Sequence, residues 1–206
     1  MNLASRWTSD WVSLGVTPVG DRVLATLIGC YTETHRAYHT LQHLEECFVQ
    51  VDASADLAER PGEVAIALWF HDAVYDTHRS DNESRSADWA REVVIQSGGS
   101  MAAAGRVGDF VLGTRHLEGS LAGDAGLVGD IDLAILAASE DRYDEYERQI
   151  RFEYQWVPEV LFRETRRRVL SAFLARPRIY ATDFFADRFE RDARQNLRRA
   201  IERLDD

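Results

Sequence analysis

The apolar residues of this chain recur at steps of three and four along almost its whole length. This spacing places them on one face of an α-helix, whereas a half-buried strand needs alternation at every second residue. Leu3, Trp7 and Trp11 follow one another at steps of four, and no stretch between turn signals sustains a two-residue alternation. The pattern therefore predicts an all-α fold without a sheet.

The same spacing locates individual helices. Residues 63–75 are apolar almost all round, which predicts a central buried helix. Ser80-Asp81-Asn82-Glu83 has the form of a capping box and predicts a helix that runs to about Gln96. The other helices are expected over about 3–11, 23–28, 143–157, 158–174 and 184–204.

Glycine is concentrated in the middle of the chain. Nine of the 13 glycines fall between Gly98 and Gly129, so we expect more loop here than elsewhere. Four prolines are few for this length, and none lies in a linker-like stretch. The 206 residues lack an internal repeat and are expected to form a single domain, 1–206.

The charged residues exclude several kinds of chemistry. The net charge is −11, and all 24 cationic side chains are arginine. The absence of lysine excludes a P-loop lysine, a Schiff-base enzyme and a Ser-Lys pair. The acidic balance argues against duplex nucleic acid as a partner, because such binding depends on neutralising phosphates. A small phosphorylated ligand remains compatible with a locally positive site.

The cysteines and the apolar segments of the sequence indicate the cellular compartment of the protein. Cys30 and Cys47 are the only cysteines, which fits reduced thiols in a cytoplasm and provides no disulfide framework. The sequence has neither a signal-peptide pattern nor an apolar run approaching ~20 residues. We therefore expect a cytoplasmic protein with no membrane partner, and nothing in the sequence excludes a homo-oligomer.

Histidines and acids in apolar surroundings are the candidate functional residues. His71-Asp72 lies inside the apolar segment 65–75, where a buried carboxylate costs several kcal/mol unless it is paired or binds a metal. Taken alone, the pair also fits a buried aspartate that bonds an arginine or a helix amino terminus. His39 and His43 stand four residues apart, which would put them on one helical face.

A third cluster lies further along the chain. Asp130 and Asp132 flank Ile131 at the apparent start of an apolar helix, where capping the helix would explain Asp130 better than Asp132. Together the three clusters could supply a mixed imidazole–carboxylate site. Such ligands suit a divalent Mn, Fe, Co, Ni, Zn or Mg ion and do not choose among them.

The order His…His-Asp…Asp resembles the signature of the HD superfamily of metal-dependent phosphohydrolases, which are all-helical. The similarity is closer still to one bacterial family of HD-type phosphohydrolases and extends from about residue 30 to the carboxyl terminus. It is carried by segments 36–43, 69–76, 81–87, 130–136, 143–146, 150–154 and 193–197. The resemblance implies a metal-binding core over about 30–140, followed by carboxyl-terminal helices over about 141–205.

The resemblance also implies the metal ligands. They are His71, Asp72, a first histidine and a late aspartate. The generic HD pattern accepts His39 as the first histidine. However, Tyr-His-x-x-x-His is similar to cyclic-nucleotide phosphodiesterases, in which the second histidine binds metal and the first is the general acid. We accordingly assign His43 to the metal and His39 to proton transfer.

For the late aspartate we prefer Asp132, because related HD proteins place this ligand directly before an apolar helical turn; Asp130 is the alternative. Asp76, four residues after Asp72, could orient the attacking water. Arg36 is a candidate phosphate clamp, since a guanidinium matches phosphate oxygens bidentately. His116 is the candidate for an extra metal ligand.

Two further features have simpler explanations. Glu83 is explained by its place in the capping box, and Arg166-Arg167-Arg168 is expected to be a solvated helix face.

These assignments predict a metal-dependent phosphohydrolase that acts on a small phosphate ester or nucleotide. One alternative is an HD-fold di-iron oxygenase, whose fuller ligand set would have to come from His116, His35, His78 and Asp76. The other is a non-catalytic regulatory module that binds a nucleotide in the same pocket.

Overall fold

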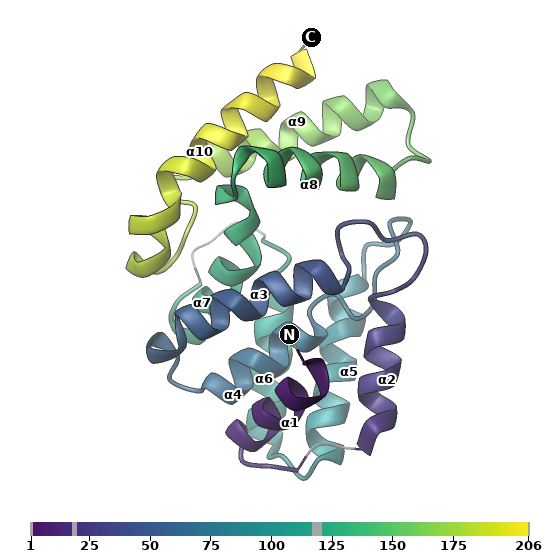
Figure 1. Cartoon of the computed structure of the whole chain (residues 1–206), viewed down its shortest axis with the longest axis vertical. Coiled ribbons are helices and arrows are strands. Elements are labelled where there is room, and N and C mark those ends of the chain that lie inside the picture. The colour runs from purple at the N-terminus through teal and green to yellow at the C-terminus, as the bar shows by residue number, and fades with distance from the viewer. Residues whose placement is uncertain (1, 18–19, 117–120, 206) are drawn as a thin grey trace.

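A computed structural model describes residues 2–17, 20–116 and 121–205, which form helices and no strands, as the apolar spacing predicts (Figure 1). The α-helices are α1 (Leu3–Ser13), α2 (Gly20–Cys30), α3 (Leu41–Ala53), α4 (Pro61–Phe70), α5 (Asn82–Gln96), α6 (Met101–Gly113), α7 (Gly123–Asp132), α8 (Glu140–Glu153), α9 (Glu159–Ala175) and α10 (Asp183–Asp205). Two 3₁₀ segments, η1 (Ala55–Leu57) and η2 (Leu133–Ala137), follow α3 and α7. Among the described helices, none has the length and apolar character needed to cross a membrane.

Helix α4 is the central element of the amino-terminal part. Every residue from Gly62 to Phe70 is buried, and α4 contacts α1, α3, α5, α6 and α7. The Trp69 indole lies edge-on to Trp7, with 5.1 Å between the ring centroids, and donates a 2.8 Å hydrogen bond to Asp10. A helix that is apolar all round can be covered on every side in this way. The predicted central helix is therefore confirmed.

This helix ends at Phe70, earlier than its apolar pattern suggests. The following backbone groups find partners outside any helix. The Arg36 guanidinium donates to the carbonyl oxygens of Asp72 and Ala73, and the Ser86 hydroxyl accepts the Val74 N–H. Because these contacts replace helical hydrogen bonds, the residues after Phe70 form a turn at the end of α4.

Most of the glycine-rich middle that the structure describes is helical, although glycine favours loops. Helices α6 and α7 occupy most of it. The side chain of Arg91 on α5 fills the space that a Cβ on Gly108 would need. A Cβ on Gly126 would lie 2.6 Å from the Leu121 carbonyl oxygen. Close packing at these glycines outweighs the cost of about 1 kcal/mol that glycine imposes on a helix.

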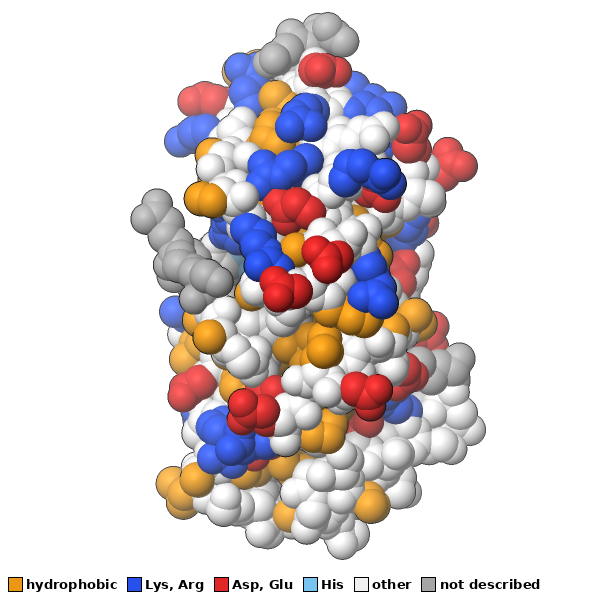
Figure 2. All heavy atoms as spheres, turned by 90° about the vertical axis from the view of Figure 1, so that its left-hand side faces the viewer, with side chains coloured by type: hydrophobic (Ala, Val, Ile, Leu, Met, Phe, Trp, Pro, Cys, Tyr) orange, Lys and Arg blue, Asp and Glu red, His pale blue; other side chains and the backbone are white. Residues whose placement is uncertain are grey.

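The carboxyl-terminal helices α8, α9 and α10 form a layer above the other helices in Figure 1. They correspond to the three helices predicted there. Helix α10 contacts α9 and η2, and the Asn196 amide donates to the carbonyl oxygens of Leu136 and Ala138. On the face shown in Figure 2, arginine and acidic side chains are interspersed over this upper layer.

Candidate metal centre and cleft

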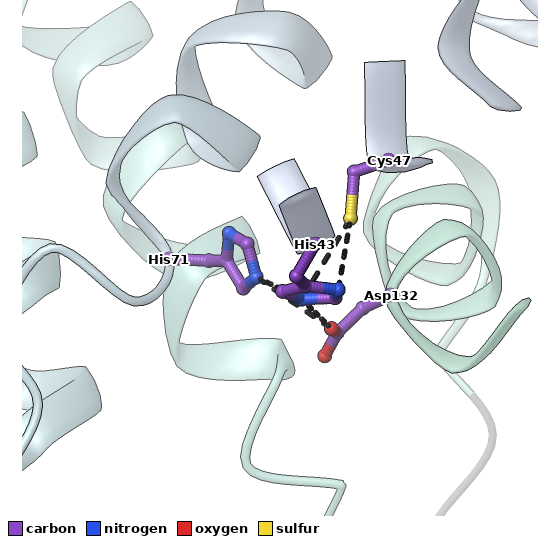
Figure 3. Close-up of side chains that lie close together, drawn as sticks. All are labelled: His43, Cys47, His71 and Asp132. Carbon is purple, nitrogen blue, oxygen red and sulfur yellow. Dashed lines mark hydrogen bonds and ion pairs between the residues drawn. The ribbon is translucent and has the colours of Figure 1, made fainter. Parts of the chain in front are cut away.

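Side chains from three helices converge on one buried point (Figure 3). His43 lies on α3, His71 directly follows α4, and Asp132 ends α7. The Nε2 atoms of His43 and His71 are 3.0 Å apart, and Oδ1 of Asp132 lies 3.1 Å from Nε2 of His43. Both imidazoles are almost fully buried, with exposed fractions of 2% and 1%.

Asp72 completes this cluster. Its Oδ2 lies 3.0 Å from Nε2 of His71 and 3.6 Å from Nε2 of His43. The structure therefore brings together the four side chains that the sequence assigns to the metal: His43, His71, Asp72 and Asp132. We call these four residues the metal cluster.

Cys47 also reaches the cluster, which sequence reasoning did not anticipate. Its Sγ lies 3.8 Å from both ring nitrogens of His43, one helical turn earlier on α3. Potential donor atoms of His43, Cys47, His71 and Asp132 all lie within 4.8 Å of one another. The signal available in the sequence was the position of Cys47, four residues after His43 and so on the same face of a helix. This buried group could hold a metal ion.

The hydrogen bonds of His71 suit a metal ligand. Its Nδ1–H donates to the Leu68 carbonyl at 2.7 Å, so that Nε2 faces His43 and offers a lone pair whenever the ring is neutral. A metal-bound histidine ordinarily donates its other ring N–H in this way. Two facing Nε2 atoms can share only one proton, and the adjacent carboxylates supply negative charge. This donor set therefore fits a divalent cation.

Opposite charges in the cluster shift the pKa values of its members strongly. Burial lowers the pKa of His71, but Asp72 and Asp132 reverse this effect and hold it well above its usual value. Burial raises the pKa of Asp132, but hydrogen bonds from His116, His43 and His71 hold it well below its usual value. The carboxylate is therefore ionised and able to bind a cation at neutral pH.

His116 contacts the cluster through Asp132. Its Nε2–H donates to Oδ2 of Asp132 at 2.7 Å, so it orients a carboxylate of the metal cluster. His116 has a φ of +50°, in the left-handed region that residues other than glycine adopt at a cost. This backbone conformation is maintained at the residue that positions Asp132.

His39 lies beside the cluster but not on the helix of His43. Helix α3 begins at Leu41, so the expected shared helical face is wrong, although the two imidazole centroids are 6.1 Å apart. Its Nδ1–H donates to Oε2 of Glu153 at 2.7 Å, and its ring stacks on Tyr75. This leaves Nε2 as the ring nitrogen without a protein partner among the described residues.

Glu153 is a site residue that the sequence did not single out. Its Oε1 accepts the backbone N–H groups of Ala37, Tyr38 and His39, and the Tyr75 hydroxyl donates to Oε2. Burial raises the pKa of Glu153, but His39 and these N–H groups bring it down to about 2. Burial lowers the pKa of His39, but Asp72 and Glu153 reverse this, and the net shift is upward.

Arg36 has a different role from the expected phosphate clamp. Its side chain has no exposed surface, and its guanidinium donates to Glu33 and to the carbonyl oxygens of His39, Asp72 and Ala73. These contacts leave no route for a phosphate to reach it. Arg36 instead ties the segment before α3 to the turn that carries Asp72.

Asp130 is also structural rather than an alternative ligand. Asp130 and Asp132 both lie at the end of α7, not at the start of a helix as expected. The Asp130 carboxylate accepts the N–H groups of Ala181 and Thr182 and the Thr182 hydroxyl, at 2.6–2.7 Å, directly before α10. The expectation that Asp130 caps the helix following it is therefore wrong, and its carboxylate instead holds the segment directly before α10.

Asp76 is not on one helical face with Asp72, because α4 has already ended. Its carboxylate accepts the His78 N–H at 2.9 Å, and its backbone bonds the Asn82 side chain. Asp76 is absent from the residues that line the cleft described below.

The capping box predicted before α5 does not form. Asp81 is the residue before α5, and its side chain makes no capping hydrogen bond.

A cleft of about 740 Å³ opens beside the metal cluster. Asp72, Asp132, His39 and His116 lie along its wall, together with apolar and aromatic residues of η2, α8 and α9. Its cationic residues are Arg79, Arg115, Arg166 and Arg176. Arg166, expected on a solvated face, is only 10% exposed and pairs with Glu147. The cleft thus brings the candidate metal cluster and positively charged side chains together.

No known protein family, curated protein or solved structure matches this chain in the comparisons made.

Proposed function

We propose that this protein is a metal-dependent phosphohydrolase of the HD type that acts on a small phosphate ester or nucleotide. The observation that carries the proposal is the convergence of His43, His71, Asp72 and Asp132 beside a cleft that also contains arginines. The resemblance of the His…His-Asp…Asp order to the HD superfamily points to the same chemistry. The free cysteines fit a cytoplasmic location.

The metal cluster would hold a divalent ion, with Mn, Fe, Co, Ni, Zn and Mg as candidates. Such an ion, when bound, lowers the pKa of water and polarises phosphoryl oxygens. Asp72 and Asp132 are the cluster members that reach the cleft, so a substrate would approach from their side. His116 and Arg36 hold their positions, the first through the Asp132 carboxylate and the second through the Asp72 backbone.

His39 is suited to donate a proton to the leaving oxygen. The Glu153 carboxylate accepts a hydrogen bond from Nδ1–H, which fixes the orientation of the ring. Asp72 and Glu153 together raise the pKa of His39, so the protonated imidazole can donate a proton from Nε2. Positioned general acids contribute on the order of 10²–10⁴-fold in rate. Because Glu153 is anchored by three backbone N–H groups, the imidazole orientation is set before substrate binds.

The placement of the other histidines favours hydrolysis over a di-iron centre. His35 bonds the Tyr75 carbonyl and His78 stacks on Trp156, so neither contributes to the metal cluster. Of the additional residues considered for a fuller ligand set, only His116 contacts a cluster side chain.

The test combines elemental analysis with a substrate panel. Protein purified under mild conditions should contain a divalent metal, and His71→Ala should lose it, while His35→Ala, a substitution of an exposed histidine, should keep it. Loss of the cation should also lower stability, because the buried carboxylates depend on it for neutralisation. Aryl phosphates and nucleotides are then tested with Mn, Mg, Co or Ni.

Metal-dependent hydrolysis of at least one class of ester supports the proposal. Inactivity across the panel would contradict it. Iron with an O₂-responsive optical band would indicate an oxygenase, and nucleotide binding without product would indicate a regulatory module. Full metal occupancy in His71→Ala would show that the site is misplaced.

A further inference from the structure

We propose that Arg176 is the phosphate-binding residue of the cleft and that its guanidinium selects a dianionic phosphate group, as in a phosphomonoester. The inference deepens the proposed function and rests on it. Because Arg36 is buried and cannot contact a phosphate, the inference gives this role to a residue of the carboxyl-terminal layer.

The arginines of the cleft differ in their partners. Arg79 forms a two-pronged pair with Asp81, and Arg166 forms one with Glu147. Arg115 donates to the Ser84 hydroxyl and lies 3.7 Å from Glu83. The positive charge of these three is therefore already balanced or shared.

Arg176 has no carboxylate partner among the residues that the structure describes. Its one side-chain hydrogen bond there is from Nη2 to the His116 carbonyl oxygen, at 2.6 Å. A guanidinium has five N–H donors, so most of its donors remain available. Burial lowers the pKa of Arg176. A partly buried cation that has no carboxylate partner within the described part of the chain is unfavourable unless a ligand supplies the negative charge.

The position of Arg176 is fixed. It directly follows α9, its carbonyl accepts a 2.7 Å hydrogen bond from Arg194, and its guanidinium lies 4.4 Å from the Phe173 ring centroid. Stacking on an aromatic ring holds the guanidinium plane while its edge stays free to donate. The side chain is thus prepared to bind an anion with little loss of conformational freedom.

Arg176 is also close to the metal cluster. The His116 backbone accepts its hydrogen bond, and the His116 side chain donates to Asp132. One residue therefore connects the guanidinium to a metal ligand. A phosphate with two unesterified oxygens beyond those near the metal matches the paired donors of a guanidinium. A diester, with one charge and fewer free oxygens, matches them less well.

Binding of inorganic phosphate tests this inference independently of turnover. Calorimetry is performed on the metal-loaded full chain and on Arg176→Ala at equal metal occupancy, with dimethyl phosphate as the monoanionic comparison. Arg178→Ala is the matched control, because Arg178 is exposed, pairs with Asp183 and does not line the cleft. Arg176→Lys keeps the charge without the fork, and Arg176→Gln replaces Arg176→Ala if that variant unfolds.

We expect the wild type to prefer phosphate over dimethyl phosphate. Arg176→Ala should weaken phosphate binding at least about 10-fold, as for a lost hydrogen bond to a charged group, and abolish the preference. Arg176→Lys should fall between them, and Arg178→Ala should equal the wild type. Unchanged phosphate binding in Arg176→Ala, or no phosphate binding by the wild type, would overturn the inference.

The outcomes separate this inference from the proposed function. Hydrolysis with phosphate affinity that does not depend on Arg176 would reject the phosphate-binding role and retain the phosphohydrolase. Phosphate binding that depends on Arg176, without hydrolysis of any ester, would retain the anion site and reject the phosphohydrolase.

Discussion

The His39 imidazole and the Glu153 carboxylate form a 2.7 Å hydrogen bond between positions 114 residues apart. Glu153 is the last residue of α8, and His39 lies just before α3. The same carboxylate holds the backbone of residues 37–39. The orientation of the proposed general acid therefore depends on a helix of the carboxyl-terminal layer.

This pair predicts a pH-dependent contribution to stability. The pKa of Glu153 falls from an ordinary 4.5 to about 2 in the folded state, so its ionised form stabilises the fold fully above pH 4.5. That stability is lost as the pH falls through about 2. At about 1.4 kcal/mol per unit, the shift corresponds to at most on the order of 3 kcal/mol.

Urea unfolding of wild type and Glu153→Gln at a series of pH values checks this prediction. Glu153→Gln should be less stable at pH 6, and the difference between the two proteins should shrink as the pH is lowered from 4.5 towards 2. A difference that stays constant over this range would mean that the carboxylate charge does not stabilise the fold.

His39 and His43 should fail in different ways when substituted. His43→Ala should be poor in metal and inactive on every substrate, because it removes a ligand. His39→Ala should retain the metal and lose about 10²–10⁴-fold in rate on alkyl phosphates or nucleotides. Its loss on nitrophenyl esters should be smaller, since a nitrophenolate needs little protonation to leave.

Metal content and kcat for the two variants, on a matched alkyl and aryl phosphate, provide the measurement. The reverse pattern would exchange the two roles. Metal loss in both variants would make both histidines ligands.

Asp130 and Asp132 should separate stability from metal binding. Asp130→Ala should retain the metal and destabilise the fold by about 1–3 kcal/mol, the usual cost of leaving a buried hydrogen-bonding group unpaired, because the N–H groups before α10 lose their acceptor. Asp132→Ala should lose metal. Denaturant unfolding of both proteins in chelator, with elemental analysis of each, distinguishes them; metal loss in Asp130→Ala would contradict its purely structural role.

Cys47 tests how many side chains the metal requires. Its Sγ is 3.8 Å from His43, and burial, with Asp132 and Asp72, holds the pKa of its thiol well above the usual value. The neutral thiol is a weak ligand, and the four histidine and aspartate side chains already converge. We expect Cys47→Ala to keep its metal content and its activity. Loss of metal in this variant would establish sulfur ligation.

Local pattern determined much of what could be predicted. Steps of three and four predicted the all-α class and the helices near both termini, because burying one face of a helix imposes that spacing. The resemblance of the order of histidines and aspartates to the HD superfamily predicted which side chains would meet in the metal cluster. The boundaries of α4 and α3 were predicted less well, because Arg36 and Glu153 supply hydrogen-bond partners from distant positions.

Other site features depend on tertiary contacts that a single sequence does not display. Asp130 holds the segment before α10, far along the chain, and Arg176 approaches the cluster only because α9 ends beside His116. The glycines of α6 and α7 suggested loop because their use at close helix contacts is invisible without the neighbouring helix. In each case the contacting residue lies too far along the chain for the spacing of apolar residues to reveal the contact.

The long reach of Glu153 also has a consequence for how the chain acquires activity as it folds. The residues of the metal cluster all precede residue 133, whereas the carboxylate that orients His39 is supplied by residue 153. Closing so long a loop has an entropic cost that is recovered only when α8 docks. A partly folded chain could therefore capture metal before its proton donor is in place, so that hydrolysis would be withheld until folding is complete.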